Sequence, residues 1–376
     1  MLRFVLTVTL LAIVVPPLPA QVRVTPQKTK GGVKYGEPWV NIPEAFRNLK
    51  IPEWPVPADL KRWQEVDRKK TRQIVLDCLG ELPPRPDPAK VKVLAREEHD
   101  DYIFERFEFH NGVDMVVTGH LAIPRNRKGP LPAVIGMHGH SGSKDEYKPN
   151  PKSDSSQGWM LVRQGYVVAA IDAYFNGERV GQGPRGQLIK DPYQQEMDLF
   201  KLHLWQGRTL WGMMLRDEQC LIDYLQTRPE VDRDRIGATG SSMGCTRAWW
   251  LSAIDDRVKV VVGVVCFPRY TELMAHGKTH GIYYYVPGLL KHFDSEAIYA
   301  LTAPRPMLQL SGDQDHNAPP AGVEVLEKKL AAMYQLYGKP ENFRSVLYKD
   351  TGHVWLPEMR EEMVEWFKRH LPAARP

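Results

Sequence analysis

The sequence predicts an α/β fold with a mostly parallel central sheet and helices on both faces. One observation is a series of short, continuous apolar runs, which are typical of strands buried on both faces. A second is the helical pattern between these runs, because alternating strands and helices form parallel sheets. A third is a pair of strand-like segments joined by Asn111-Gly112, a hairpin signal that predicts antiparallel strands at the start of the sheet.

The composition is ordinary for a globular protein of one large domain or two domains. Of the 376 residues, 43% are hydrophobic and 25% are charged, which is enough apolar material for a sizeable core. The formal net charge of +5 is mild and its basic residues are dispersed, so we expect no nucleic-acid partner. The four cysteines match no disulfide framework and are expected to be mostly buried thiols: Cys78, Cys220, Cys245 and Cys266.

Residues 1–20 have the layout of a signal peptide. Arg3 supplies a positive charge, Phe4–Val15 an apolar run, and residues 18–20 a cleavage end. The apolar run is shorter than the roughly 20 residues that span a membrane. We therefore expect cleavage and a secreted or periplasmic protein without stable membrane insertion, with an uncleaved anchor as the alternative.

The next segment, residues 21–90, is predicted to be an arm and a helix packed on a larger domain, residues 91–376. Residues 21–57 are rich in proline, glycine and lysine, which is typical of an extended arm. From Ala58 to Leu79 the apolar residues recur at helical spacing, and the proline-rich stretch 83–88 then ends the helix.

The larger domain alternates strands and helices. Strands are expected at Val91–Ala95, Tyr102–Phe109, Met115–Ile123, Pro132–His138, Tyr166–Asp172, Arg235–Thr239, Val258–Val265, Met307–Leu310 and Phe343–Tyr348. Helices are expected at Gln157–Gln164, Met213–Gln226, Met243–Ile254, Gly322–Tyr337 and Pro357–His370.

Two insertions, residues 174–206 and 267–299, interrupt this alternation. Each follows a strand and is expected at the carboxyl edge of the sheet, where open α/β folds bind ligands. The first contains a glycine-rich loop, but that loop lacks the Gly-Lys-Ser/Thr ending of a phosphate-binding loop. We interpret both insertions as cleft walls or a lid.

The pentapeptide Gly240-Ser-Ser242-Met-Gly244 fits the pattern G-x-S-x-G between a predicted strand and a predicted helix. In that context it predicts a nucleophile elbow, in which Ser242 occupies a sharp, strained turn. The flanking glycines fit this reading because bulkier residues would clash with the neighbouring strand and helix. Ser241 is expected to be a hydrogen-bonding neighbour of the nucleophile.

A serine nucleophile needs a histidine base and a carboxylate that orients the base. After an elbow of this type, the acid and then the histidine follow later strands. Ser311-Gly-Asp-Gln-Asp315 follows the strand at 307–310, and Lys349-Asp-Thr-Gly-His353 follows the strand at 343–348. His353 is therefore the candidate base, and Asp315 and Asp313 are the candidate acids.

Together these motifs resemble those of α/β-hydrolases, most closely the branch of dienelactone hydrolases and acetyl xylan esterase-like enzymes. The resemblance spans residues 132–370 and rests on Met137-His-Gly-His140, Gly240–Gly244, Ala303-Pro-Arg-Pro306, Gly312-Asp-Gln-Asp315 with Pro319 and Pro320, and Gly352-His353.

The resemblance implies a role for each matching position. Ser242 would be the nucleophile, His353 the general base and acid, and Asp315 the orienting acid, because the family's Gly-x-x-Asp pattern falls on Asp315. The oxyanion hole would consist of the backbone N–H groups of Met243 and His140. The chain departs from many relatives at Cys245, where they have a second glycine after the elbow, so the packing of the elbow against its helix is expected to differ.

No metal or other cofactor is predicted. His276 and His280 have the i, i+4 spacing of a helical metal site. Gly277 and Gly281 disfavour a helix there, and no third ligand stands out.

The sequence thus predicts an exported serine hydrolase that cleaves a carboxylic ester through an acyl-enzyme. By resemblance, the substrate is a small-molecule or polysaccharide ester, such as an acyl ester of a carbohydrate, or else a glucuronoyl ester or lactone. A serine peptidase of the prolyl-oligopeptidase type shares the order of motifs, but the segment before residue 130 is too short for a β-propeller. A non-catalytic binding protein is the remaining alternative, and the complete Ser, Asp and His set argues against it.

Overall fold

The computed structural model describes residues 43–47, 49–125, 127 and 129–373. Its strands form a nine-stranded sheet in the order β1-β2-β3-β5-β4-β6-β7-β8-β9. The strands are β1 Lys92–Glu98, β2 Tyr102–His110, β3 Val116–Pro124, β4 Leu131–Met137, β5 Val167–Ile171, β6 Val231–Ser241, β7 Val258–Val264, β8 Met307–Gly312 and β9 Phe343–Tyr348.

The sheet changes character along its width, as the sequence predicts. Strands β1, β2, β3 and β5 pair antiparallel, and β5, β4, β6, β7, β8 and β9 pair parallel. β4 and β5 are buried along their whole length, because helices cover both faces there. β1 and β9 are the two edge strands. β1 is mostly exposed and largely charged, which is typical of an edge that must not pair with another chain.

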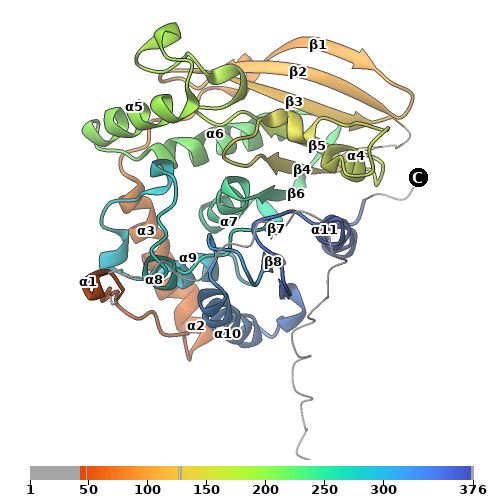
Figure 1. Ribbon diagram of the computed structural model, residues 1–376. Coiled ribbons are helices and arrows are strands. Elements are labelled where there is room, and N and C mark those ends of the chain that lie inside the picture. The colour runs from red at the N-terminus through yellow and green to blue at the C-terminus, as the bar shows by residue number, and fades with distance from the viewer. Residues whose placement is uncertain (1–42, 48, 126, 128, 374–376) are drawn as a thin grey trace, which may run out of the picture.

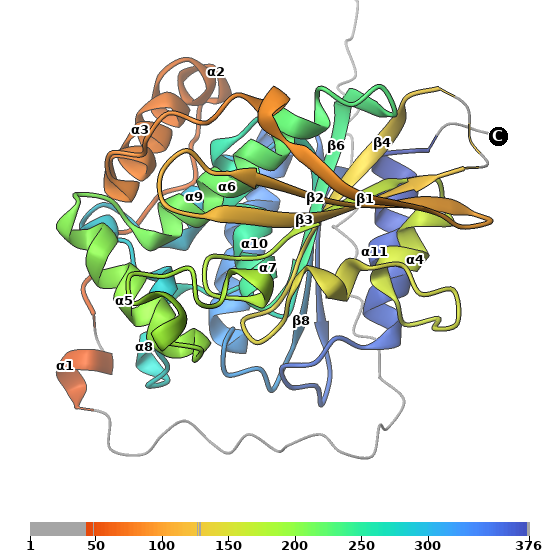
Figure 2. The same cartoon turned by 90° about the horizontal axis from the view of Figure 1, so that it is seen from above.

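Helices cover the two faces of the parallel part (Figures 1 and 2). α4 and α11 pack on one face, and α6, α7, α9 and α10 pack on the other. Each face of the sheet has its own cluster of buried apolar side chains. The longer helices are α3 Arg68–Leu79, α5 Pro192–Trp205, α6 Leu210–Leu225, α7 Met243–Ile254, α10 Pro320–Leu336 and α11 Pro357–His370. The shorter ones are α1 Glu44–Arg47, α2 Leu60–Arg62, α4 Gln157–Val162, α8 Tyr270–Ala275 and α9 Ser295–Ala300.

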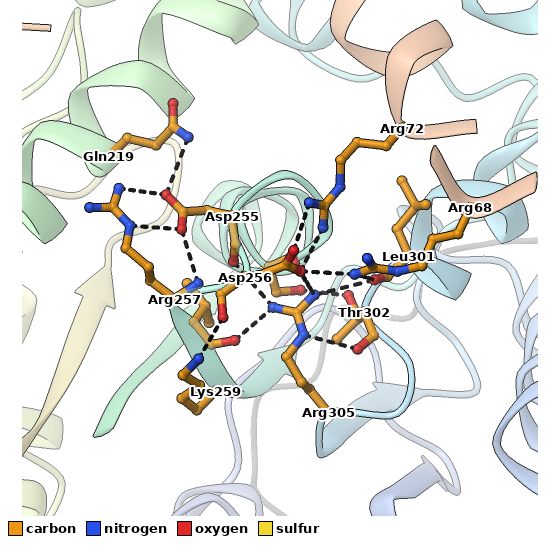
Figure 3. A network of polar contacts seen from close by, with 12 residues as sticks. Arg68, Arg72, Gln219, Asp255, Asp256, Arg257, Lys259, Leu301, Thr302 and Arg305 are labelled. Carbon is orange, nitrogen blue, oxygen red and sulfur yellow. Dashed lines mark hydrogen bonds and ion pairs between the residues drawn. The ribbon is translucent and has the colours of Figure 1, made fainter. Parts of the chain in front are cut away.

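The helix expected over residues 58–79 is present from Leu60 to Leu79, with one π turn, η1 Trp63–Asp67, between α2 and α3. This segment is fixed to the rest of the chain by polar contacts. Arg68 and Arg72 both donate to the Asp256 carboxylate, at 2.8 and 2.6 Å, and Arg305 forms an ion pair with the same carboxylate at 3.3 Å (Figure 3). Two guanidinium groups of α3 and one from the segment between α9 and β8 thus meet at one carboxylate in the loop between α7 and β7.

Some predicted bounds differ from the structure. The strand expected from Arg235 begins at Val231, where a register shift in its pairing with β4 accommodates the polar residues 232–234. The two insertions contain helices that the sequence did not indicate: α5 in the first, and α8 and α9 in the second. In the described part of the chain, no helix combines the length and the hydropathy that crossing a membrane requires. The predicted signal peptide, residues 1–20, lies outside the described residues, as does the arm up to residue 42.

Candidate active site

Ser242 lies between the end of β6 and the start of α7, in an unusual backbone conformation. Its φ and ψ are 55° and −118°, a combination that non-glycine residues adopt only where the surrounding structure holds them in it. The two glycines of the pentapeptide explain how the turn closes. A Cβ added to Gly240 would lie 2.4 Å from the Gly244 carbonyl carbon, and a Cβ added to Gly244 would lie 1.8 Å from the Met137 carbonyl oxygen. The glycines therefore allow α7 to start directly against β4 and β6.

This geometry predicts that Gly244→Ala destabilises the protein by more than about 3 kcal/mol, because the obstructing atom is backbone and cannot rotate away. Chemical denaturation of the purified variant measures the effect. Gly186→Ala separates the two possible costs: Gly186 has a φ of 55° but no atom within 4 Å of an added Cβ, whereas the helical Gly244 has no positive φ. Gly186→Ala should therefore cost only the backbone strain of about 1–2 kcal/mol. Equal losses in the two variants would contradict this account of the turn.

Cys245, which stands where many relatives have a second glycine, fits beside the elbow because β7 carries a glycine where α7 packs on it. Its buried thiol donates to the Cys266 carbonyl oxygen, with Sγ 3.0 Å from that oxygen. A Cβ on Gly263 of β7 would come within 2.7 Å of the Cys245 sulfur. Burial raises the pKa of the Cys245 thiol. The thiol therefore stays protonated and acts as a small apolar side chain of the core. The extra volume at Cys245 is thus matched by missing volume at Gly263.

Three of the predicted site residues form one hydrogen-bonded line. His353 Nε2 lies 2.8 Å from Ser242 Oγ, and His353 Nδ1 lies 2.8 Å from Asp315 Oδ2. Because a carboxylate only accepts, Nδ1 carries the hydrogen and Nε2 is left to accept from the Ser242 hydroxyl. The Asp315 side chain is fully buried, and its other oxygen accepts from the Asn317 N–H at 2.8 Å. This arrangement orients the imidazole as a base for Ser242 requires.

Asp313, the competing acid, has a different position. Its carboxylate accepts from the Thr351 N–H at 3.2 Å, across the loop that carries His353. The hydrogen bonds found among the described residues join His353 to Asp315 and not to Asp313. Asp313 thus holds the backbone of the loop that carries His353, and Asp315 contacts the His353 ring.

The loop after β4 lies against the elbow. A Cβ on Gly139 would lie 3.9 Å from the Ser242 Cβ, so the loop from His138 to His140 passes directly beside the predicted nucleophile. The Met243 N–H belongs to the first turn of α7 and has no acceptor within the helix. These are the two segments from which the sequence predicts the oxyanion donors.

His138 is a structural residue of this loop and not a base. Its Nε2 accepts from the Ala173 N–H at 3.0 Å, so its Nδ1 carries the hydrogen and donates to the Gly139 carbonyl at 2.7 Å. Burial, with a contribution from the nearby Arg247 cation, lowers the pKa of His138 to about 3. Arg247 also donates to the His138 carbonyl at 2.8 Å and pairs with the buried Glu218 at 2.7 Å. The loop is therefore fixed from both sides.

Comparison with known proteins identifies the family of this chain. A family model, described as Abhydrolase family, matches residues 50–364. The chain belongs to the Abhydrolase family.

One relative found by sequence comparison is named "Putative hydrolase YtaP", from Bacillus subtilis (strain 168). It is 34% identical over 316 residues, which is 81% of this chain and 100% of that protein. Solved structures share the fold. One, titled as a putative acetyl xylan esterase from Bacteroides fragilis NCTC 9343, has a TM-score of 0.64 at 20% identity over 88% of both chains. A glucuronoyl esterase from Solibacter usitatus has a TM-score of 0.62 at 17% identity, over 85% of this chain and 99% of that chain. The α/β-hydrolase fold predicted from the sequence is confirmed.

In this Abhydrolase family member, the two insertions meet the loop after β4. Asn176 of the first insertion donates to the His140 carbonyl at 2.7 Å. Glu196 of α5 lies 2.7 Å from His140 Nε2 and also accepts from the Tyr283 N–H of the second insertion at 3.0 Å. Sequence reasoning missed both Asn176 and Glu196, because nothing in their local sequence distinguishes them from other polar insertion residues.

The second insertion lines a small, partly open apolar pocket of about 70 Å³. Its lining includes one histidine, three tyrosines and five aliphatic or thioether side chains: His280, Tyr270, Tyr284, Tyr285, Leu273, Met274, Val286, Leu289 and Leu290. His280 Nε2 also lies 3.8 Å from the sulfur of Cys266, directly after β7. Burial lowers the pKa of His280 to about 4, with a smaller effect of His353 in the same direction, so its ring is neutral near pH 7.

His276 and His280 do not share a helical face. α8 ends at Ala275, and the His276 ring contacts the Glu272 carbonyl oxygen at 2.7 Å, whereas His280 contacts Cys266. Across the described ranges, no group of three or more histidine, cysteine, aspartate or glutamate side chains has the arrangement of a metal site.

Proposed function

We propose that this protein is a serine esterase that cleaves an acyl ester of a carbohydrate through a covalent acyl-enzyme. The observation that carries the proposal is the hydrogen-bonded line from Ser242 Oγ through His353 to the buried Asp315, placed beside backbone N–H groups. A hydroxyl, a base and an orienting carboxylate in this order are the parts that nucleophilic acyl transfer requires.

In the proposed reaction, Ser242 Oγ attacks the ester carbonyl while His353 Nε2 takes the hydroxyl proton. The carbonyl oxygen becomes an oxyanion, for which the backbone N–H groups of Met243 and His140 are the proposed donors; each such donor is typically worth about 10²–10³ in kcat. The C–O bond to the alcohol then breaks, and His353 gives its proton to the leaving oxygen. Water, activated by His353, attacks the acyl-enzyme and releases the acid and free Ser242.

The choice of a carbohydrate ester is supported by analogy with solved structures of the same fold that are titled as acetyl xylan and glucuronoyl esterases. The signal-peptide layout of residues 1–20 supports export to the periplasm or the medium, where a protein can encounter polysaccharide esters.

A substrate panel tests this proposal. It comprises acetylated xylan, acetylated monosaccharides, a glucuronoyl ester, a lactone and a peptide anilide, each with the wild-type protein and the Ser242→Ala variant. We expect the highest Ser242-dependent kcat/KM on an acyl ester of a sugar. Preferred cleavage of the glucuronoyl ester or the lactone would correct the substrate class, and preferred cleavage of the anilide would replace the esterase by a peptidase.

A further inference from the structure

Glu196 is a buried carboxylate that lies at the junction of both insertions with the loop beside Ser242. It comes from α5, and its side chain is only 3% exposed. One oxygen lies 2.7 Å from His140 Nε2, and the other accepts from the Tyr283 N–H at 3.0 Å. A carboxylate is expensive to bury unless its hydrogen bonds are satisfied, and here both oxygens have partners.

His140 is held at two points by these contacts. Its carbonyl oxygen accepts from Asn176 at 2.7 Å, and its ring is fixed by Glu196. Three aromatic rings also pack near the imidazole, at centroid distances of 5.6 Å for Phe175, 5.2 Å for Tyr193 and 4.9 Å for Tyr283. The His140 N–H belongs to the peptide group shared with Gly139, whose carbonyl oxygen accepts from the His138 ring at 2.7 Å and from the Gly142 N–H at 3.1 Å. With that peptide group held on one side and the His140 ring and carbonyl held on the other, the direction of the His140 N–H is fixed.

We propose that Glu196 is a positioning residue of the oxyanion hole: through the His140 imidazole, it holds the His140 backbone N–H in the direction of the developing oxyanion. This inference rests on the esterase function proposed above. It also gives the insertions a role beyond that of cleft walls, since α5 supplies the carboxylate and Tyr283 fixes its orientation.

Because the oxyanion exists only in the transition state, loss of its alignment lowers kcat more than it raises KM. Misplacement of a catalytic group by about 1 Å can cost on the order of 10² in rate. For Glu196→Ala we therefore expect kcat for an aryl acetate to fall roughly 10- to 100-fold with KM nearly unchanged. Glu196→Gln keeps the size and one acceptor, so it should fold like the wild type and lose less activity.

The matched control is Asp198→Asn on the same helix. Asp198 pairs with Arg185 at 2.7 Å, away from His140, so this variant should retain the wild-type kcat. A trifluoromethyl ketone, whose adduct with the nucleophile carries an oxyanion, supplies a second measurement. Its inhibition constant should rise in Glu196→Ala in parallel with the loss of kcat/KM.

A double-variant cycle with His140→Ala shows whether Glu196 acts through the imidazole. In the His140→Ala background, Glu196→Ala should cause little further loss of kcat. Unchanged kcat in Glu196→Ala, or an equal loss with and without the His140 ring, would overturn this inference while leaving the esterase function intact. Absence of Ser242-dependent turnover in the wild-type protein would instead overturn the proposed function, and this inference with it.

Discussion

Replacement of Ser242 by alanine is expected to lower kcat for an acyl ester by about 10⁶, because the covalent route is lost and only binding and oxyanion stabilisation remain. The fold should not suffer, since the side chain that is removed bonds to His353 and fills no core position. Initial rates with a chromogenic acetyl ester measure the loss, and the circular dichroism of the variant checks its fold.

Ser241→Ala is the matched control for this prediction. Ser241 is the last residue of β6 and is adjacent to Ser242 in sequence, but His353 bonds to Ser242. The control should keep most of the wild-type rate. If Ser241→Ala lost the activity and Ser242→Ala kept it, the assignment of the nucleophile would be wrong.

The second large effect is expected at the acid. Asp315→Asn should lower kcat by about 10⁴, because an amide in contact with Nδ1 no longer selects the imidazole tautomer that accepts from Ser242. Asp313→Asn should have a much smaller effect, since the Asp313 carboxylate accepts from the Thr351 N–H at 3.2 Å, whereas the hydrogen bond of His353 Nδ1 goes to Asp315. Parallel pH–rate profiles of the two variants make the comparison. A large loss in Asp313→Asn with near-normal turnover in Asp315→Asn would reverse the roles.

The parallel strands and the elbow were predictable from the sequence because their physical causes are local. A strand buried on both faces needs a continuous apolar run, such as Ala133–Met137 in β4. The turn at Ser242 needs small residues on both sides, which Gly240 and Gly244 provide. The order of acid and histidine follows from the order of the strands that carry them.

The contacts that shape the site were not predictable, because they join residues that are far apart in sequence. Glu196 meets His140 across 56 residues, and nothing in either local sequence indicates the pair. Cys245 of α7 fits its site because the packing of α7 on β7 places Gly263 next to its sulfur. The burial of α5 runs against the polarity of its residues: the apolar Met197, Leu204 and Trp205 are exposed, whereas the polar Glu196 and His203 are buried. Its sequence pattern therefore does not identify the face that packs on the domain.

The buried ion pairs around the loop after β4 were likewise not predictable from the sequence. Lys144 and Asp172 form a buried ion pair at 2.6 Å, and Arg247 and Glu218 form another at 2.7 Å. In the sequence these residues resemble ordinary surface charges. Breaking such a pair by removing one partner is costly, typically about 3–5 kcal/mol, which makes these residues part of the scaffold that holds the loop against the elbow.

The most direct test of the central claim is reaction of the protein with a fluorophosphonate, followed by intact mass and peptide mapping. We expect a single adduct on the wild-type protein, located on the peptide that contains Ser242, and no adduct on Ser242→Ala. An unmodified wild-type protein, or an adduct that persists in Ser242→Ala, would contradict the account of Ser242 as an activated nucleophile.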